Sequence, residues 1–487
     1  MSATFRSLKL HNYRVWFIGA IVSNAGSWMQ STAQNWVVLT ELTDADAAAV
    51  GITMALQFAP PLLLVPVTGW VADRFDRRKL LLLSQTILAF LALAIGVLLI
   101  TNIMTLPIML CFAAALGLVT AFDNPARQAF VSDLVGQENM SNAVALNSAS
   151  FNVARLVGPA LAGVLIIAVG TGWVFVINSG TFAAMIIALL LIRVRDLTPR
   201  APRGTQNRLS EGFRYVSGRP DLLMVFLIVG VVGAFGMNFP IIASTMALEF
   251  EQDADGFGLL NSVLAIGSLA GALLAARRAE ARVRVVILGA GLFTVASFIS
   301  AFMPTYWLYA ITLTLTGFSV VTMLTTANAV VQTTTSPALR GRVLALYMAV
   351  VMGGTPLGAP IIGWVAEQFG PRMAILAGGA AAAIVFVIGM IWLTSGGRTS
   401  RVEGTRFKFE VTDTRPIPII EPEEFSDELA QTTPVSLPKR TTPRRPRRPR
   451  NAETAKLAAE APQRGAEAPQ RTPRVDPPRI TPAASDD

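Results

Sequence analysis

The sequence is poor in charged residues, in cysteine and in histidine. Charged residues make up 15% of the 487 residues, against about 25% in soluble domains. Because 53% of the residues are hydrophobic and the mean hydropathy is +0.53, a soluble enzyme is a poor interpretation. The single cysteine, Cys111, excludes an internal disulfide, and the single histidine, His11, excludes a histidine-rich metal site.

Long apolar runs dominate residues 1–394, and each is close to the 20 or so residues that a helix needs to cross a bilayer. They predict an all-α membrane protein with twelve transmembrane helices, at 13–40, 48–72, 80–100, 106–128, 141–168, 172–192, 221–249, 256–276, 284–302, 306–334, 340–369 and 372–394. Residues 395–487 contain 14 of the 29 prolines and 31 charged groups. Such a composition cannot bury enough apolar surface to fold, and we predict a disordered cytoplasmic tail.

Basic residues are distributed unevenly between the predicted connections. Of the 23 Lys and Arg residues in 1–394, 21 lie on one side of the predicted membrane, and Arg155 and Arg372 are the exceptions. Cytoplasmic loops carry an excess of Lys and Arg. We therefore predict a multi-pass protein of the inner (plasma) membrane, with both termini in the cytoplasm.

The predicted helices fall into two similar halves. Gly158 and Gly163 recur 200 residues later as Gly358 and Gly363. Duplicated halves are typical of transporters that bind substrate between the two halves. The predicted organisation is an N-terminal six-helix bundle, a cytoplasmic linker, a C-terminal six-helix bundle and the tail, at 1–192, 193–220, 221–394 and 395–487.

The connection after the second predicted helix reads Gly69-Trp-Val-Ala-Asp73-Arg74-Phe-Asp76-Arg77-Arg78-Lys79. It resembles the signature loop of the major facilitator superfamily, G-x-x-x-D-R-x-G-R-[RK], with Asp76 where many members have glycine. The segments GSWMQ, DNPARQAF and RLVGPALAG narrow the resemblance to the enterobactin-exporter-like (transmembrane secretion effector) branch. The resemblance covers residues 5 to about 394 and implies the major facilitator fold of two six-helix bundles.

The same loop is a candidate gate. Contacts between a carboxylate and cations at helix ends can form in one conformation and break in another. The gating residues we predict are Gly69, Asp73, Arg74, Arg77, Arg78 and Arg127. The resemblance implies Arg127 as the partner of Asp73. The alternative is that the cations only follow the preference for positive charge in the cytoplasm.

Polar side chains inside the apolar runs need a cavity or a hydrogen-bonding partner. Ser23, Ser27, Gln30 and Gln34 follow one face of the first predicted helix. They predict either a wet pathway or hydrogen bonds that join helices. The substrate-pathway residues we predict are Asn24, Gln30, Gln34, Asn152 and Arg155.

Arg155 lies near the middle of the fifth predicted helix. It either pairs with a neighbouring carbonyl or faces a cavity that attracts an anionic or hydrogen-bonding substrate. The following Gly158, Pro159 and Gly163 resemble the glycine-proline motif in the fifth helix of exporters, and the resemblance favours export over uptake.

Asp123 is the candidate proton carrier, because no other acidic residue is better placed within a predicted helix. We place it about one turn from the cytoplasmic end of its helix. The alternative is a helix-ending charge neutralised by Arg127. Proton coupling itself is implied only by the family.

The sequence predicts a secondary exporter of small amphipathic compounds, siderophore-like or drug-like. The alternatives are an uptake permease, a lysolipid flippase or a membrane sensor that does not transport. No nucleophile–base pair, metal cluster or GxxxxGK[ST] motif is present, so we predict no enzyme, metal or cofactor. The expected partners are substrate, protons and the lipid bilayer; we expect a monomer, and no nucleic acid because the arginines of the tail lack aromatic neighbours.

Overall fold

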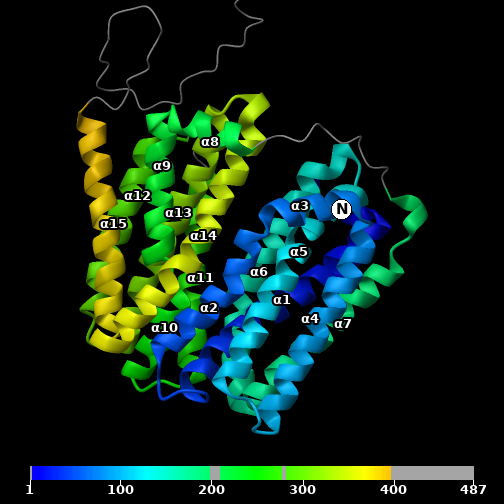
Figure 1. The fold of residues 1–487 in the computed structure, drawn as a ribbon, viewed down its shortest axis with the longest axis horizontal. Coiled ribbons are helices and arrows are strands. Elements are labelled where there is room, and N and C mark those ends of the chain that lie inside the picture. The colour runs from blue at the N-terminus through cyan, green and yellow to red at the C-terminus, as the bar shows by residue number, and fades with distance from the viewer. Residues whose placement is uncertain (1–2, 198–208, 277–280, 396–487) are drawn as a thin grey trace, which may run out of the picture. The chain divides into compact units, whose positions relative to one another are not determined.

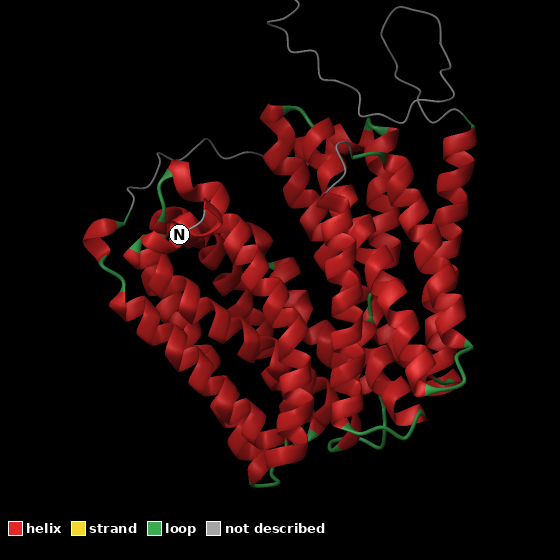
Figure 2. Cartoon of the chain, turned by 180° about the vertical axis from the view of Figure 1, so that it is seen from behind, coloured by secondary structure: helices red, strands yellow, loops and turns green. Residues whose placement is uncertain are grey.

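The computed structural model describes residues 3–197, 209–276 and 281–395. Within these ranges the chain forms helices joined by short connections and contains no strand (Figure 2). The all-α prediction is therefore confirmed. The predicted tail, apart from its first residue, and the middle of the predicted linker lie outside the described residues.

The N-terminal half contains a short 3₁₀ segment and seven α-helices. Their bounds are η1 Ala3–Lys9, α1 His11–Thr40, α2 Ala47–Leu63, α3 Val65–Arg74, α4 Arg77–Ile100, α5 Leu106–Leu134, α6 Gln137–Val169 and α7 Thr171–Leu191 (Figure 1).

The C-terminal half repeats this plan after the short helices η2 Val194–Asp196 and α8 Leu209–Ser217. It contains α9 Pro220–Val231, the π-helical turn η3 Val232–Gly236, α10 Phe239–Glu249, α11 Ala254–Ala276, α12 Val283–Ala301, α13 Tyr306–Thr334, α14 Pro337–Phe369 and α15 Pro371–Thr394.

Ten helical segments of the described chain are long and apolar enough to cross a membrane. The first two of the twelve predicted helices are the ones that differ. Helix α1 has 30 residues but carries the polar stripe. The second predicted helix is divided into α2 and α3 at Leu64, next to Pro60 and Pro61, because proline removes a backbone donor and clashes with the preceding turn. The seventh is divided into α9 and α10 by the turn η3.

The two halves contact each other through two equivalent helix pairs, α2 with α14 and α6 with α11. A Cβ added to Gly163 of α6 would lie 2.7 Å from the carbonyl oxygen of Ala254. A Cβ added to Gly363 of α14 would lie 2.5 Å from the carbonyl oxygen of Ala47. The Glu367 carboxylate also accepts a hydrogen bond from the backbone N–H of Ala47 (3.0 Å). Glycine thus allows close backbone packing where the halves meet.

The repeat found in the sequence is also visible in the packing inside each half. Gly158 packs against Trp28 of α1, and Gly358 packs against the backbone of Ala234 in η3. Gly158 and Gly358 therefore make equivalent contacts within their own halves. Gly163 and Gly363 make equivalent contacts with the other half.

Candidate functional site

A cavity of about 740 Å³ lies among the helices of the N-terminal half, with Met348 of α14 at its edge. Fourteen of the 22 residues that line it are polar, although apolar atoms make up most of the lining surface. Five asparagines and three glutamines contribute to it: Asn24, Asn124, Asn147, Asn152, Asn178, Gln30, Gln57 and Gln128. Amide side chains both donate and accept hydrogen bonds, so this lining can bind a ligand with groups of both kinds.

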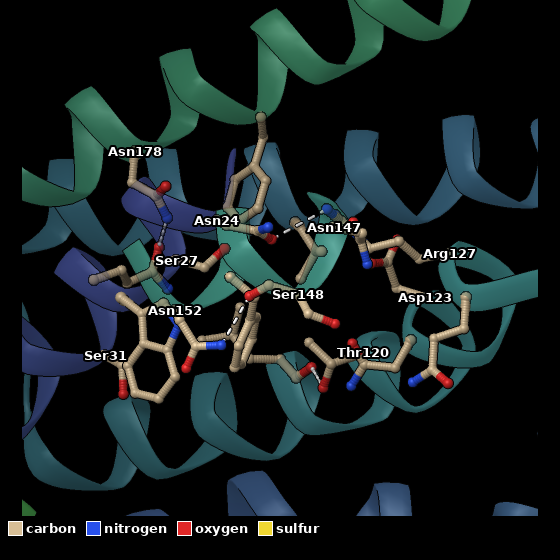
Figure 3. A pocket seen from close by; sticks show the side chains of 18 of the residues that line it. Asn24, Ser27, Ser31, Thr120, Asp123, Arg127, Asn147, Ser148, Asn152 and Asn178 are labelled. Carbon is tan, nitrogen blue, oxygen red and sulfur yellow. Dashed lines mark hydrogen bonds and ion pairs between the residues drawn. The ribbon is translucent and has the colours of Figure 1, made fainter. Parts of the chain in front are cut away.

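An ion pair between Asp123 and Arg127 lies at one end of this cavity (Figure 3). The Asp123 carboxylate accepts hydrogen bonds from the Ser84 hydroxyl (2.5 Å), the Gln85 amide (2.8 Å) and Nε of Arg127 (3.1 Å). Arg127 also donates to Asn24 at 3.4 Å. The network joins α1, α4 and α5 and offsets the cost of burying Asp123, which is 3% exposed.

Asp123 lies deeper in its helix than the sequence indicated. Helix α5 continues to Leu134, about three turns beyond Asp123, and not one turn as we expected. The predicted end at residue 128 was wrong because Pro125 and Arg127 resemble a helix end, although proline here interrupts only one backbone bond.

The structure brings Asn24, Gln30 and Asn152 to the cavity, but not Gln34. The Asn178 amide donates to the Gln30 carbonyl, and the Asn152 amide donates to the backbone carbonyl of Ser148 (2.8 Å). Gln34 is 1% exposed, and its amide atoms have no hydrogen-bond partner among the described residues.

Arg155 lines a second, smaller cavity of about 160 Å³ between the two halves. The two cavities share Trp28, Ser31 and Gln57. The guanidinium carbon of Arg155 lies 5.7 Å from the centre of the Trp28 ring, which is within cation–π distance. Asn152 and Arg155 are three residues apart on α6, yet they line different cavities.

The candidate gate has interactions that the sequence did not identify. Nη1 of Arg77 donates to Asp133 (2.6 Å), a residue near the end of α5. Nε of Arg78 donates to the carbonyl of Leu189 (2.8 Å) in the last turn of α7, where backbone carbonyls lack helical partners. The loop thus ties α4 to the ends of two neighbouring helices. Asp133 lies five residues beyond the predicted helix end at 128, so the sequence did not identify it as a partner.

The remaining motif residues are placed as follows. Arg74 lies over the Trp70 ring at 5.5 Å, and a Cβ on Gly69 would meet no atom within 4 Å. Helix α3 includes Asp73, but its side chain lies outside the described residues. The carboxylate that pairs with Arg127 in the described structure is Asp123.

Pro159 and Gly163 of the fifth-helix motif lie where the halves meet, whereas Gly158 packs against α1. A Cβ added to Gly258 of α11 would lie 2.6 Å from the carbonyl oxygen of Pro159.

The described residues contain no cluster of three or more His, Cys, Asp or Glu side chains that could hold a metal ion.

A family model described as a transmembrane secretion effector matches residues 2–402. The chain belongs to this family. Its relatives and its fold place it in the major facilitator superfamily, as the motifs indicated, and it is a multi-pass membrane transporter.

Three curated relatives cover most of the chain. The staphyloferrin A transporter of Staphylococcus aureus is 26% identical over 365 residues, which cover 73% of this chain and 90% of that protein. The multidrug efflux pump Tap of Mycolicibacterium fortuitum is 28% identical over 383 residues (74% and 90%). The enterobactin exporter EntS of Salmonella typhimurium is 26% identical over 371 residues (73% and 86%).

Solved structures of transporters share the fold. A bacterial homologue of the human lysosomal transporter Spinster, in an inward-facing and occupied conformation, has a TM-score of 0.62 at 16% identity, covering 80% of this chain and 97% of that one. The nucleoside transporter NupG has a TM-score of 0.62 at 14% identity, covering 78% and 98%. At these identities the likeness shows the fold alone.

Proposed function

We propose that this protein is a proton-coupled exporter of small amphipathic compounds, siderophore-like or drug-like, in the inner (plasma) membrane. The observation that carries the proposal is the amide-lined cavity, which holds an ion pair at one end and adjoins a cavity between the halves. Transport is favoured over catalysis because the side chains of the cavity can bind and orient a ligand, while their described members include no nucleophile–base pair. The names of the relatives support export of siderophores or drugs.

We further propose that transport proceeds by alternating access. The halves meet where α2 begins and α14 ends, at Ala47 and Glu367. The Lys and Arg distribution assigns this end to the outside. The state described here is then closed to the outside, and its cavity is open to the cytoplasm.

In this proposal the loop after α3 acts as the gate. The contacts of Arg77 with Asp133 and of Arg78 with Leu189 hold α4 against α5 and α7 within one half. The family motif implies that Asp73 acts between the halves when the cytoplasmic ends close. Asp123 remains the proposed proton carrier, since it lines the cavity and its protonation would release Arg127.

Everted membrane vesicles test the function. With an inside-acid gradient, an exporter is expected to accumulate labelled enterobactin inside these vesicles, and a protonophore is expected to abolish the accumulation. Accumulation only in right-side-out vesicles would identify an uptake permease. Movement of labelled lysolipid across the membrane of the same vesicles would identify a flippase. If no probe moves in either orientation, transport is excluded and a membrane sensor is the remaining alternative.

The proposed orientation predicts a labelling pattern. In a Cys111→Ala background, cysteines at Thr43 and Asp253 are expected to react with an impermeant maleimide added to intact cells. Both residues lie in connections that carry no Lys or Arg. A cysteine at the exposed Gly341, at the start of α14, is expected to react only after the cells are permeabilised. Labelling at Gly341 in intact cells would contradict cytoplasmic termini.

A further inference from the structure

The charges around the two cavities do not cancel. The charged residues among their described lining are Asp123, Arg127 and Arg155. Asp123 and Arg127 form an ion pair, so they neutralise each other. Arg155 makes no ion pair or hydrogen bond with the described residues, and its contact is with the Trp28 ring. The joined cavities therefore carry one positive charge in excess.

Arg372, the other arginine outside the basic connections, shows how this chain satisfies such a cation. Nε of Arg372 donates to Glu249 (2.5 Å), and Nη1 donates to the carbonyls of Ala301 and Met303. Arg155 has none of these acceptors. An unpaired cation within the membrane region costs free energy, so its presence points to a partner that arrives from outside the protein.

The surroundings of Arg155 favour a strong contact with an anion. The N-terminal half supplies Trp28 on one side, and the C-terminal half supplies an apolar wall that includes Met237, Phe239 and Phe257. Phe257 is held by stacking on Trp36, with ring centres 5.7 Å apart. Apolar walls exclude water, and charge-assisted hydrogen bonds are stronger where water is excluded. The planar guanidinium presents paired donors that match the two oxygens of a carboxylate or a similar anion.

The volumes of the two cavities indicate which part of a ligand each can hold. Drug-sized ligands occupy pockets of about 300–1,000 Å³, so 160 Å³ holds an anionic group but not a whole ligand. The remainder has room in the 740 Å³ cavity, which the smaller one joins at Trp28, Ser31 and Gln57. Ser31 lies at the end of that cavity away from Asp123 and Arg127 (Figure 3). The body of the ligand thus lies among amides and apolar side chains.

We propose that the joined cavities bind an amphipathic monoanion, with its anionic oxygens on Arg155 in the smaller cavity and a body with both hydrogen-bonding and apolar groups in the larger one. This inference rests on the proposed function and specifies the charge and polarity of the compound transported. A cation fits poorly, because Arg155 repels it.

The test is binding to the full-length protein in lipid nanodiscs at neutral pH, measured by calorimetry. Three probes share a benzamide body: N-benzoylglycine carries a carboxylate, N-benzoylglycinamide is neutral and N-(2-aminoethyl)benzamide carries an ammonium group. The carboxylate probe is expected to bind about tenfold to a hundredfold more tightly than the neutral probe, and the ammonium probe most weakly.

Two variants locate the preference. Arg155→Gln is expected to lower the affinity for the carboxylate probe to that for the neutral probe. Arg155→Lys is expected to give an intermediate loss of affinity, because it keeps the charge but not the paired donors. The control is Arg14→Gln, at an exposed position of α1, which is expected to change nothing. Equal binding of the carboxylate and neutral probes to the wild-type protein would overturn the inference whether or not the variants fold. A carboxylate preference that survives Arg155→Gln would overturn it as well.

Binding to the purified protein depends neither on the direction of transport nor on protons. A selective site in a protein that fails the vesicle assay would therefore contradict only the proposed export. Export without any preference for anions would contradict only this inference.

Discussion

Asp123→Asn is expected to lower gradient-driven export about tenfold or more, while exchange of substrate down its own gradient continues. The substitution keeps the size of the side chain but removes the charge that pairs with Arg127, and it removes the group that would carry the proton. A charge-assisted hydrogen bond contributes about 1.5–3 kcal/mol. Because about 1.4 kcal/mol corresponds to a factor of ten, the loss of this pair alone predicts a loss of export of about tenfold or more. Initial rates in everted vesicles, with and without the pH gradient, measure both activities.

The matched control is Glu138→Gln, which removes an exposed carboxylate from the same half. It is expected to leave driven export and exchange unchanged. Equal loss of driven export and exchange in Asp123→Asn, together with a lower melting temperature, would show that Asp123 only holds α4 against α5. Unchanged driven export would remove Asp123 from the mechanism.

Gly358→Val is expected to give the largest loss of stability among single substitutions at the helix contacts. A Cβ at this position would overlap the backbone carbonyl of Ala234 in η3, and a backbone atom cannot move aside as a side chain does. Overpacking a close helix contact costs about 1–3 kcal/mol, and more where the backbone must shift. The expected result is a much lower yield of folded protein and a melting temperature lower by several degrees in detergent.

Gly180 of α7 provides the control for this prediction. It is also a helical glycine, but it is exposed and a Cβ there would meet no atom within 4 Å. Gly180→Val is therefore expected to fold with nearly the wild-type melting temperature. A melting temperature for Gly358→Val equal to that of Gly180→Val would show that α14 and η3 are not in close contact in the membrane.

The sequence alone was sufficient for the all-α membrane fold and the family. A run of apolar residues has to leave water, and its length and the placement of Lys and Arg follow from the bilayer. The stripe of polar residues along α1 also predicted either a wet face or hydrogen bonds between helices, because amides cannot face lipid. These properties depend on residues close together in the chain, or on the composition of whole segments.

Only the tertiary structure decided which polar groups meet. Asp123 lies 38 residues from Gln85, and the packing of α4 against α5 brings them within hydrogen-bond distance. The sequence analysis placed Asn152 and Arg155 on one substrate pathway, but in the structure they line two different cavities, and the C-terminal half contributes to the one that holds Arg155. Gln34 continues the stripe of Gln30 and yet is buried away from the cavity. Periodicity determines the direction of a side chain from its own helix, whereas its partners depend on the neighbouring helices and on how closely glycines such as Gly163 let them approach.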